Sequence, residues 1–228
     1  MLNINQLKPI SEEEWEKRQK EKKIRELGNP IFNIGNYTID IDGKFICHNH
    51  VEINKLNLTS FPINFKEIQG CFSCSYNHLT SLKGSPEIVH QNFNCTDNHL
   101  TSLKFCPKLI RSSFCCSNNP LTNLYGLPKI IYGHFYCSNT IISNLKYSPE
   151  IIEGDFYCNN NPLTSLKYCP KLIKKDFYCN SFIKNLNFFP DKIEGYVVCH
   201  DENYQYINKH YQNRVKKKII NFKLMEKL

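Results

Sequence analysis

The chain has 228 residues, a formal net charge of +8, and 41% hydrophobic and 13% aromatic residues, which is enough apolar material for a core. No apolar run approaches the ~18 residues that a membrane span requires, and residues 1–14 lack the charged-then-apolar pattern of a secretion signal. Twelve cysteines without such a signal favour free thiols in a reducing compartment over a disulfide framework. We therefore expect an intracellular protein that is not secreted and has no membrane span.

The first segment, residues 1–30, is predicted to contain a helix at about 11–27. Ser11 and Glu14 fit a capping box, in which each side chain bonds the backbone N–H of the other residue. A glycine and a proline just beyond the helix end its pattern. Its apolar residues are few, so two arrangements remain open: the helix docks along one edge of the molecule, or it is an arm that folds on a partner.

The second segment, residues 31–46, is predicted to form a β-hairpin that caps the N-terminal end of the following array. Apolar and polar residues alternate from Tyr37 to Cys47. The alternation is centred on Asp42-Gly43, a strong signal for a two-residue turn.

Residues 47–202 contain about seven copies of a 21-residue repeat, of which the copy at 173–192 is shortened to 20 residues. In each full copy a Phe and a Cys lie two positions apart. The Phe column is Phe72, Phe93, Phe114, Phe135, Phe156 and Phe177, and the Cys column is Cys74, Cys95, Cys116, Cys137, Cys158 and Cys179. A constant period of this length predicts a solenoid, in which each unit buries its apolar face against its neighbours.

The repeat resembles the leucine-rich repeat family. His90-x-x-Phe93-x-Cys95-x-x-Asn98-x-Leu100 has that family's spacing L-x-x-L-x-L-x-x-N-x-L. The resemblance implies a parallel β arc with short strands on its concave face, extended or 3₁₀ segments on its convex side, and helical ends. The repeat sequence also resembles repeats in giant-virus and phage proteins. The chain lacks Ala but is rich in Asn, Lys and Ile, a composition that fits the codons of an AT-rich genome such as theirs.

Some copies depart from the family pattern. The family's Asn turns the chain out of each strand and bonds the backbone of its neighbours. The corresponding position holds Thr140, Phe182 and Glu202 in three copies. We expect the regular spiral to loosen there.

Residues 203–228 are predicted to form a basic amphipathic helix that covers the last repeat. Apolar residues from Tyr204 to Met225 recur at intervals of three or four, which is helical spacing. The candidate residues for binding nucleic acid or another anion are Arg214, Lys216, Lys217, Lys218 and Lys223.

The cysteine column is expected to be buried, because Phe and Cys at i and i+2 of a strand point to the same side. A buried Cys behaves as a small hydrophobe, and an in-register column offers no tetrahedral ligand set. Structural filling is therefore favoured over a metal or redox role. Glycine-rich phosphate loops and the common hydrolase and zinc motifs are absent from the sequence, so we expect no catalytic residues, no metal and no cofactor.

The residue between Phe and Cys should point away from the core. In three consecutive copies it is a tyrosine, at Tyr136, Tyr157 and Tyr178. The neighbouring outward positions include His134, Asp155, Asp176, Asn159 and Asn180. Exposed Tyr beside small polar and acidic groups is typical of a recognition surface, although cross-strand Tyr stacking can also serve only to stabilise a sheet face.

These patterns predict a non-enzymatic module that binds a protein partner on its concave β face, with the aspartates favouring a basic partner. Two alternatives remain open. The chain is a structural virion or assembly component of a large DNA virus or phage, or it binds nucleic acid through the basic C-terminal segment.

Overall fold

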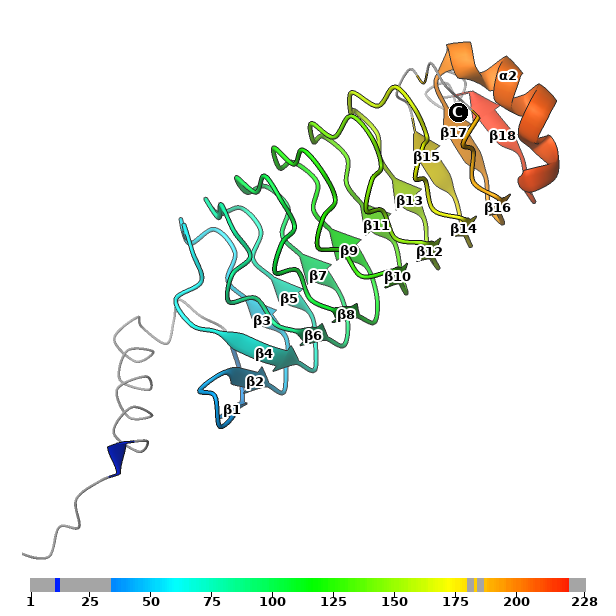
Figure 1. Ribbon diagram of the computed structural model, residues 1–228. Coiled ribbons are helices and arrows are strands. Elements are labelled where there is room, and N and C mark those ends of the chain that lie inside the picture. Colours follow the sequence, from blue (N-terminus) through cyan, green and yellow to red (C-terminus); the bar gives the residue numbers. More distant parts are fainter. Residues whose placement is uncertain (1–10, 13–33, 180–182, 184–186, 222–228) are drawn as a thin grey trace, which may run out of the picture.

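The protein is a parallel β-solenoid in which each turn of about 21 residues stacks on the previous one (Figure 1). The structure is a computed structural model that describes residues 11–12, 34–179, 183 and 187–221. The long stack of short strands runs from the N-terminal hairpin to a helix at the C-terminal end. The predicted solenoid and its period are confirmed.

One row of strands contains the Phe and Cys columns and forms a nine-stranded sheet. Its register is constant, since each Phe pairs with the Phe of the next turn. The strands are β3 (Val51–Glu52), β5 (Phe72–Ser73), β7 (Phe93–Asn94), β9 (Phe114–Cys115), β11 (Phe135–Tyr136), β13 (Phe156–Tyr157), β15 (Phe177–Cys179), β17 (Val197–Cys199) and β18 (Ile219–Asn221).

A second row of strands lies a few residues before the first in every turn. It is divided into a five-stranded and a four-stranded sheet. The five-stranded sheet contains β1 (Tyr37–Ile39), β2 (Phe45–Cys47), β4 (Phe65–Ile68), β6 (Ile88–Val89) and β8 (Leu109–Ile110). The four-stranded sheet contains β10 (Ile130–Ile131), β12 (Ile151–Ile152), β14 (Leu172–Ile173) and β16 (Lys192–Ile193).

The second row corrects the expected cross-section. The expected row of short parallel strands is present, but each turn also has a second short strand, and the two strands meet at a corner. The segments that return from one turn to the next are turns and irregular chain, and η2 (Gln212–Arg214) is the 3₁₀ helix among the described residues. From β4 onward, each second-row strand ends in a fully buried Ile or Val, such as Ile152. Burial of this side chain brings the backbone into the stack, where it pairs with the strands of the preceding and following turns.

The core is a stack of aromatic rings. Phe135, Phe156 and Phe177 are at most 1% exposed, and their ring centroids lie 5.3 and 5.4 Å apart along the stack. The column cysteines lie beside them and are also buried. The free energy of folding therefore comes mainly from contacts between successive turns.

A column of buried asparagines holds the loops that follow the first-row strands. Asn98 is 5% exposed, and its Nδ2 donates to the carbonyls of Cys74 and Cys95, at 3.0 and 3.2 Å. Its Oδ1 accepts the backbone N–H of Leu79 at 3.0 Å. Asn77, Asn119 and Asn161 are buried at the equivalent position of other turns. Each Asn thus satisfies buried backbone groups of two turns, which is needed where the chain leaves the sheet.

The expected loosening at Thr140 is wrong. Thr140 is 5% exposed, and both its backbone N–H and its hydroxyl bond Asn161 Oδ1, at 3.0 and 2.5 Å. The strands of these two turns stay in register. The hydroxyl is short enough to occupy the Asn position and to bond the Asn of the next turn.

The other two departures have different outcomes. Phe182 lies outside the described residues. Glu202 is exposed, and the next residue, Asn203, does the work expected at that position: it is 4% exposed, accepts from Ile183 N and donates to Ile183 O.

At the N-terminal end, β1 and β2 form the expected antiparallel hairpin. The predicted two-residue turn is wrong, since Asp40 N donates to Lys44 O and residues 41–43 form a three-residue loop. Gly43 ends this loop with a φ of 71°, the left-handed conformation typical of such loops. Strand β2 then pairs in parallel with β4, so the hairpin joins the second row. The helix predicted at 11–27 lies outside the described residues except for Ser11 and Glu12.

The continuous helix predicted at 203–228 is wrong. Helix α2 covers Asp201–Tyr211, η2 follows, and the chain then returns as β18 to pair in parallel with β17. Val215 and Ile219 are buried against the last turn, where Val215 bridges Ile193 of β16 and Ile219 pairs with Val197 of β17. A helix here would leave the edges of these two strands unbonded. Within the described part of the chain no helix has the length and hydrophobicity to cross a bilayer.

Candidate partner-binding surface

The three tyrosines predicted as a recognition surface lie side by side on the outer face of the nine-stranded sheet. Tyr136, Tyr157 and Tyr178 are in register on β11, β13 and β15. Their rings are stacked, with centroids 4.7 and 4.3 Å apart and interplanar angles of 9° and 6°. All three side chains are half-buried. We call this set the tyrosine face.

The phenol groups of the tyrosine face are uncharged hydrogen-bonding groups. Burial raises the pKa of Tyr136, Tyr157 and Tyr178 above the ordinary value of 10.0. The nearby carboxylates add to the shift, because a phenolate beside them would be repelled. The tyrosines therefore offer the edges of a ring stack, with neutral hydroxyl donors over the whole physiological pH range.

The half-buried acidic residues beside this face hold successive turns together. Asp155 Oδ1 accepts the backbone N–H of Asp176 at 2.9 Å, and Asp176 Oδ1 accepts that of Tyr196 at 2.8 Å. The second oxygen of each aspartate faces a tyrosine hydroxyl, at 3.5 Å for Tyr157 and 3.3 Å for Tyr178. Asp155, assigned from the sequence only to the outward face, therefore also joins successive turns.

The remaining predicted residues divide into three groups. His134 belongs with the tyrosine face, because its Nδ1 lies 2.8 Å from Asp155 Oδ2. Asn159 is half-buried and has interactions of its own within the structure. Asn180 lies outside the described residues.

The basic candidates near the C-terminus do not form one helix face. Arg214, in η2, donates to the carbonyl of Phe189 at 3.1 Å and lies 5.2 Å from the centroid of the Tyr211 ring, so it helps to attach the end of the chain. Residues 216–218 are exposed in the bend before β18, and Lys217 Nζ lies 4.7 Å from the Tyr196 ring centroid. Lys223 lies outside the described residues.

A second set of aromatic residues, not anticipated from the sequence, is more exposed than the tyrosine face. It lies on the turn that precedes the second row of strands, and its members are 45–51% exposed. They are Phe105, Tyr125, Tyr147, Tyr168 and Phe188. We call this set the corner aromatic row. Its sequence signal is the recurrent Leu-Lys-aromatic triplet at 103–105, 145–147 and 166–168.

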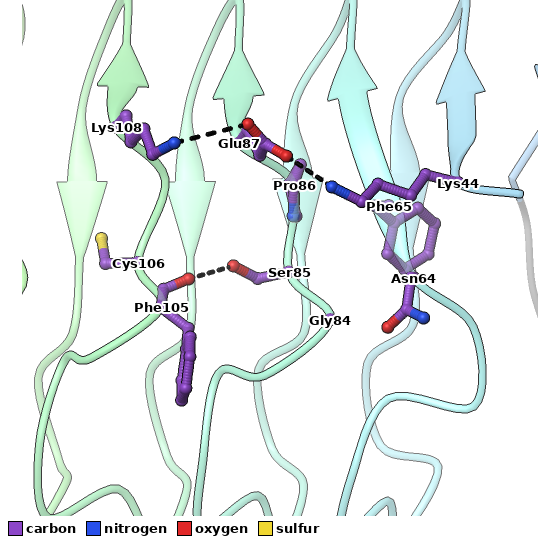
Figure 2. A pocket seen from close by; sticks show the side chains of 10 residues that line it. All are labelled: Lys44, Asn64, Phe65, Gly84, Ser85, Pro86, Glu87, Phe105, Cys106 and Lys108. Carbon is purple, nitrogen blue, oxygen red and sulfur yellow. Dashed lines mark hydrogen bonds and ion pairs between the residues drawn. The ribbon is translucent and has the colours of Figure 1, made fainter. Parts of the chain in front are cut away.

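A hollow of about 270 Å³ lies beside the N-terminal end of this row (Figure 2). An ion-pair chain crosses it, with Glu87 2.7 Å from Lys44 and 3.6 Å from Lys108. Ser85 donates to the carbonyl of Phe105 at 2.7 Å, which fixes the turn between two successive copies. The hollow is lined by Lys44, Asn64, Phe65, Gly84, Ser85, Pro86, Glu87, Phe105, Cys106 and Lys108.

The titratable groups of this hollow show no activated nucleophile. The hydrogen bond from Lys44 lowers the pKa of Glu87, which keeps the carboxylate ionised. Burial raises the pKa of the Cys106 thiol, which keeps it protonated and unreactive. The arrangement suits a structural ion pair rather than acid–base chemistry.

The cysteine column is also chemically quiet. All twelve cysteines are free thiols. The column Sγ atoms face the carbonyls of the next turn, as from Cys95 to Cys115 O at 3.4 Å, and burial raises their pKa. In the part of the chain that the structure describes, no three His, Cys, Asp or Glu side chains are grouped to hold a metal ion.

The fold and the surface together define the class of protein: a free-thiol parallel β-solenoid with aromatic columns inside and outside. No protein-family model, curated protein or solved structure matches the chain.

Proposed function

We propose that the protein is a non-enzymatic binding module whose tyrosine face contacts a protein partner. The observation that supports this most directly is the stack of Tyr136, Tyr157 and Tyr178, with ring centroids 4.7 and 4.3 Å apart. Tyrosine is enriched at protein interfaces because it buries a large area with few rotatable bonds. Here the stacking fixes the rings before binding, so little side-chain entropy remains to be lost.

The partner's chemistry follows from the groups around the rings. The phenols are neutral donors, and the carboxylates of Asp155 and Asp176 lie at their hydroxyl ends. A partner with an Arg or Lys beside an apolar anchor would pair its cation with a carboxylate and place the anchor on the rings. His134 lies beside the same carboxylate, with its Nδ1 2.8 Å from Asp155 Oδ2.

We also propose kinship with leucine-rich repeat proteins and residence in a reducing compartment. The kinship is supported by the buried asparagines, which bond the backbone of neighbouring turns as the family's Asn does. The location is supported by twelve free thiols, of which the column members lie too deep for exchange.

The test is affinity purification from cells that express the protein natively, followed by mass spectrometry. The bait variant replaces Tyr136, Tyr157 and Tyr178 by Asn. The fold accepts Asn at this position, since an earlier turn has Asn94 there. A partner that is captured by the wild type and lost from this variant supports the proposal. If the variant keeps every partner, the tyrosine face is not the binding surface.

A matched control separates loss of this face from a general loss of exposed aromatics. It replaces Phe105, Tyr147 and Tyr168 by Gly, so that three rings are removed from the corner aromatic row instead. The proposal requires this control to keep the partner that the tyrosine-face variant loses.

A further inference from the structure

The corner aromatic row has a backbone conformation that its side chains disfavour. Phe105, Tyr147 and Tyr168 each have a φ of 69°, in the left-handed region. Two other copies place Gly84 and Gly126 at this point, with φ of 96° and 112°. Glycine adopts such angles readily, whereas a bulky side chain is strained there. The rings therefore cost conformational energy at positions where the solenoid also folds with glycine, which points to a task other than folding.

Lysines alternate with the rings along the same corner. The Nζ atoms of Lys104, Lys146 and Lys167 lie 5.0–5.1 Å from the centroids of the aromatic rings that follow them in the sequence. Lys167 also lies 5.9 Å from the ring of Phe188, one turn further on. Each of these rings thus has a cation close to it and remains about half exposed.

The corner is poor in competing negative charge. Glu87 is paired with lysines at 2.7 and 3.6 Å, and Glu150 with lysines at 3.2 and 3.5 Å. Those lysines belong to the preceding and following turns. No Asp or Glu occurs in the loops 80–84, 101–105, 122–126, 143–147 and 164–168. Asp191, which lines a hollow together with Tyr168 and Phe188, lies 4.0 Å from Arg214. With these acids paired, the lysines beside the rings make the surrounding surface positive.

We propose that the corner aromatic row binds single-stranded nucleic acid, with bases stacked on the rings and phosphates paired with the lysines. Base faces are accessible only in an unpaired strand, and stacking on aromatic side chains is how such strands are held without sequence preference. An acidic peptide would pair with the lysines but would leave the half-exposed ring faces without planar partners.

The dimensions agree with this ligand. Phe105 and Phe188 lie four turns apart in a stack with a rise of ~4.8 Å per turn, so the row extends for roughly 19 Å. Tyr125 and Tyr147 are in edge contact at 5.3 Å, which makes the row continuous across the copy that has Gly126. Such a length holds about four nucleotides, the lower end of the range for single-strand sites.

Fluorescence anisotropy with a labelled oligothymidylate of about 12 nucleotides tests the proposal on the full chain. Replacing Phe105, Tyr147 and Tyr168 by Gly removes the rings and relieves the left-handed strain, so the variant should melt no lower than the wild type. We expect its affinity to fall by more than about 100-fold, since each stacked base contributes roughly five- to 150-fold.

Two further variants complete the test. Tyr76→Asn is the control, because Tyr76 is also exposed, has a φ of 55° and lies 5.3 Å from Lys55 Nζ, but belongs to another corner. It should bind like the wild type. Changing Lys104, Lys146 and Lys167 to Gln should flatten the slope of log affinity against log salt by about 2, from ~0.7 per lost phosphate contact.

Several outcomes would overturn the proposal: no binding by the wild type at low salt, unchanged affinity of the glycine variant, or equal affinity for duplex DNA or heparin. If the glycine variant fails to fold, the lysine variant decides, and an unchanged salt slope then rejects the site. The tyrosine face is intact in all these variants, so this proposal and the proposed protein contact fail independently.

Discussion

Two adjacent residues of β13 give the sharpest test of how the strands face. Phe156 is fully buried, with its ring 5.3 and 5.4 Å from those of Phe135 and Phe177. Its neighbours are held by sheet hydrogen bonds and cannot collapse into the space that Phe156→Ala would leave. The cost should therefore lie near the middle of the range for buried aromatic truncations, at about 4 kcal/mol of the free energy of unfolding.

Tyr157→Ala is the matched control on the other side of the same strand. Its ring is stacked at 4.7 and 4.3 Å, but it is half-buried and its removal opens no cavity. Two lost stacking contacts of about 0.5–1.5 kcal/mol each predict a loss of about 1–3 kcal/mol.

Equilibrium denaturation with guanidinium chloride measures both values. Circular dichroism and tyrosine fluorescence should be recorded together, because coincident transitions are needed before one free energy is assigned to a repeat array. A loss below 1 kcal/mol for Phe156→Ala, or an equal loss for the two variants, would show that the facing of the strand is wrong.

Three further predictions concern the buried polar groups, the thiols and the ion pair. Asn119→Ala should lower the free energy of unfolding by about 2–4 kcal/mol, because it leaves the N–H of Leu100 and two buried carbonyls without partners. The control in the same denaturation assay is Asn118→Gly, which should change stability little because Asn118 is exposed and has a left-handed backbone. A smaller effect at Asn119 than at Asn118 would contradict the role of the Asn column. Burial raises the pKa of Cys115 to about 11 from 9.0, so its alkylation by iodoacetamide at pH 8 should be about 100-fold slower than that of an ordinary thiol. Mass spectrometry follows the reaction, whose rate should rise with pH up to about pH 11. Labelling at the ordinary rate would show that the thiol is open to solvent. The pKa of Glu87 is lowered by Lys44, so this pair stabilises the fold fully above about pH 4.5 and loses its contribution as the pH falls through the lowered pKa. Lys44→Met should therefore make the melting temperature less dependent on pH in that acid range. An unchanged dependence would mean that the pair does not contribute to stability.

The candidate surface was only partly accessible from the sequence. The position between Phe and Cys could be assigned outward from strand alternation alone, and Tyr136, Tyr157 and Tyr178 lie there. The hydrogen bonds of Asp155 could not be anticipated, because they join backbone groups of the next turn whose position depends on the bend between the two rows of strands.

The corner aromatic row illustrates the same limit. The recurrent triplets were visible in the sequence, but their exposure depends on the left-handed turn at Phe105 and its equivalents. Aromatic residues rarely adopt a left-handed backbone, so the sequence alone does not place these side chains on an exposed turn. The cation–ring distances then follow from the packing of successive turns.

By itself the sequence determined the solenoid, its 21-residue period, the inward Phe and Cys columns and the hairpin at Asp42-Gly43. These follow from period and alternation, which state which positions are equivalent and which share a side. Only the tertiary structure decided where each turn bends, that Ile152 belongs to a second row of strands, and that the end of the chain is the strand β18. Spacing of three or four suits a helix, but Val215 and Ile219 also fit extended chain. The backbone edges of β16 and β17, which need partners, decide between the two conformations.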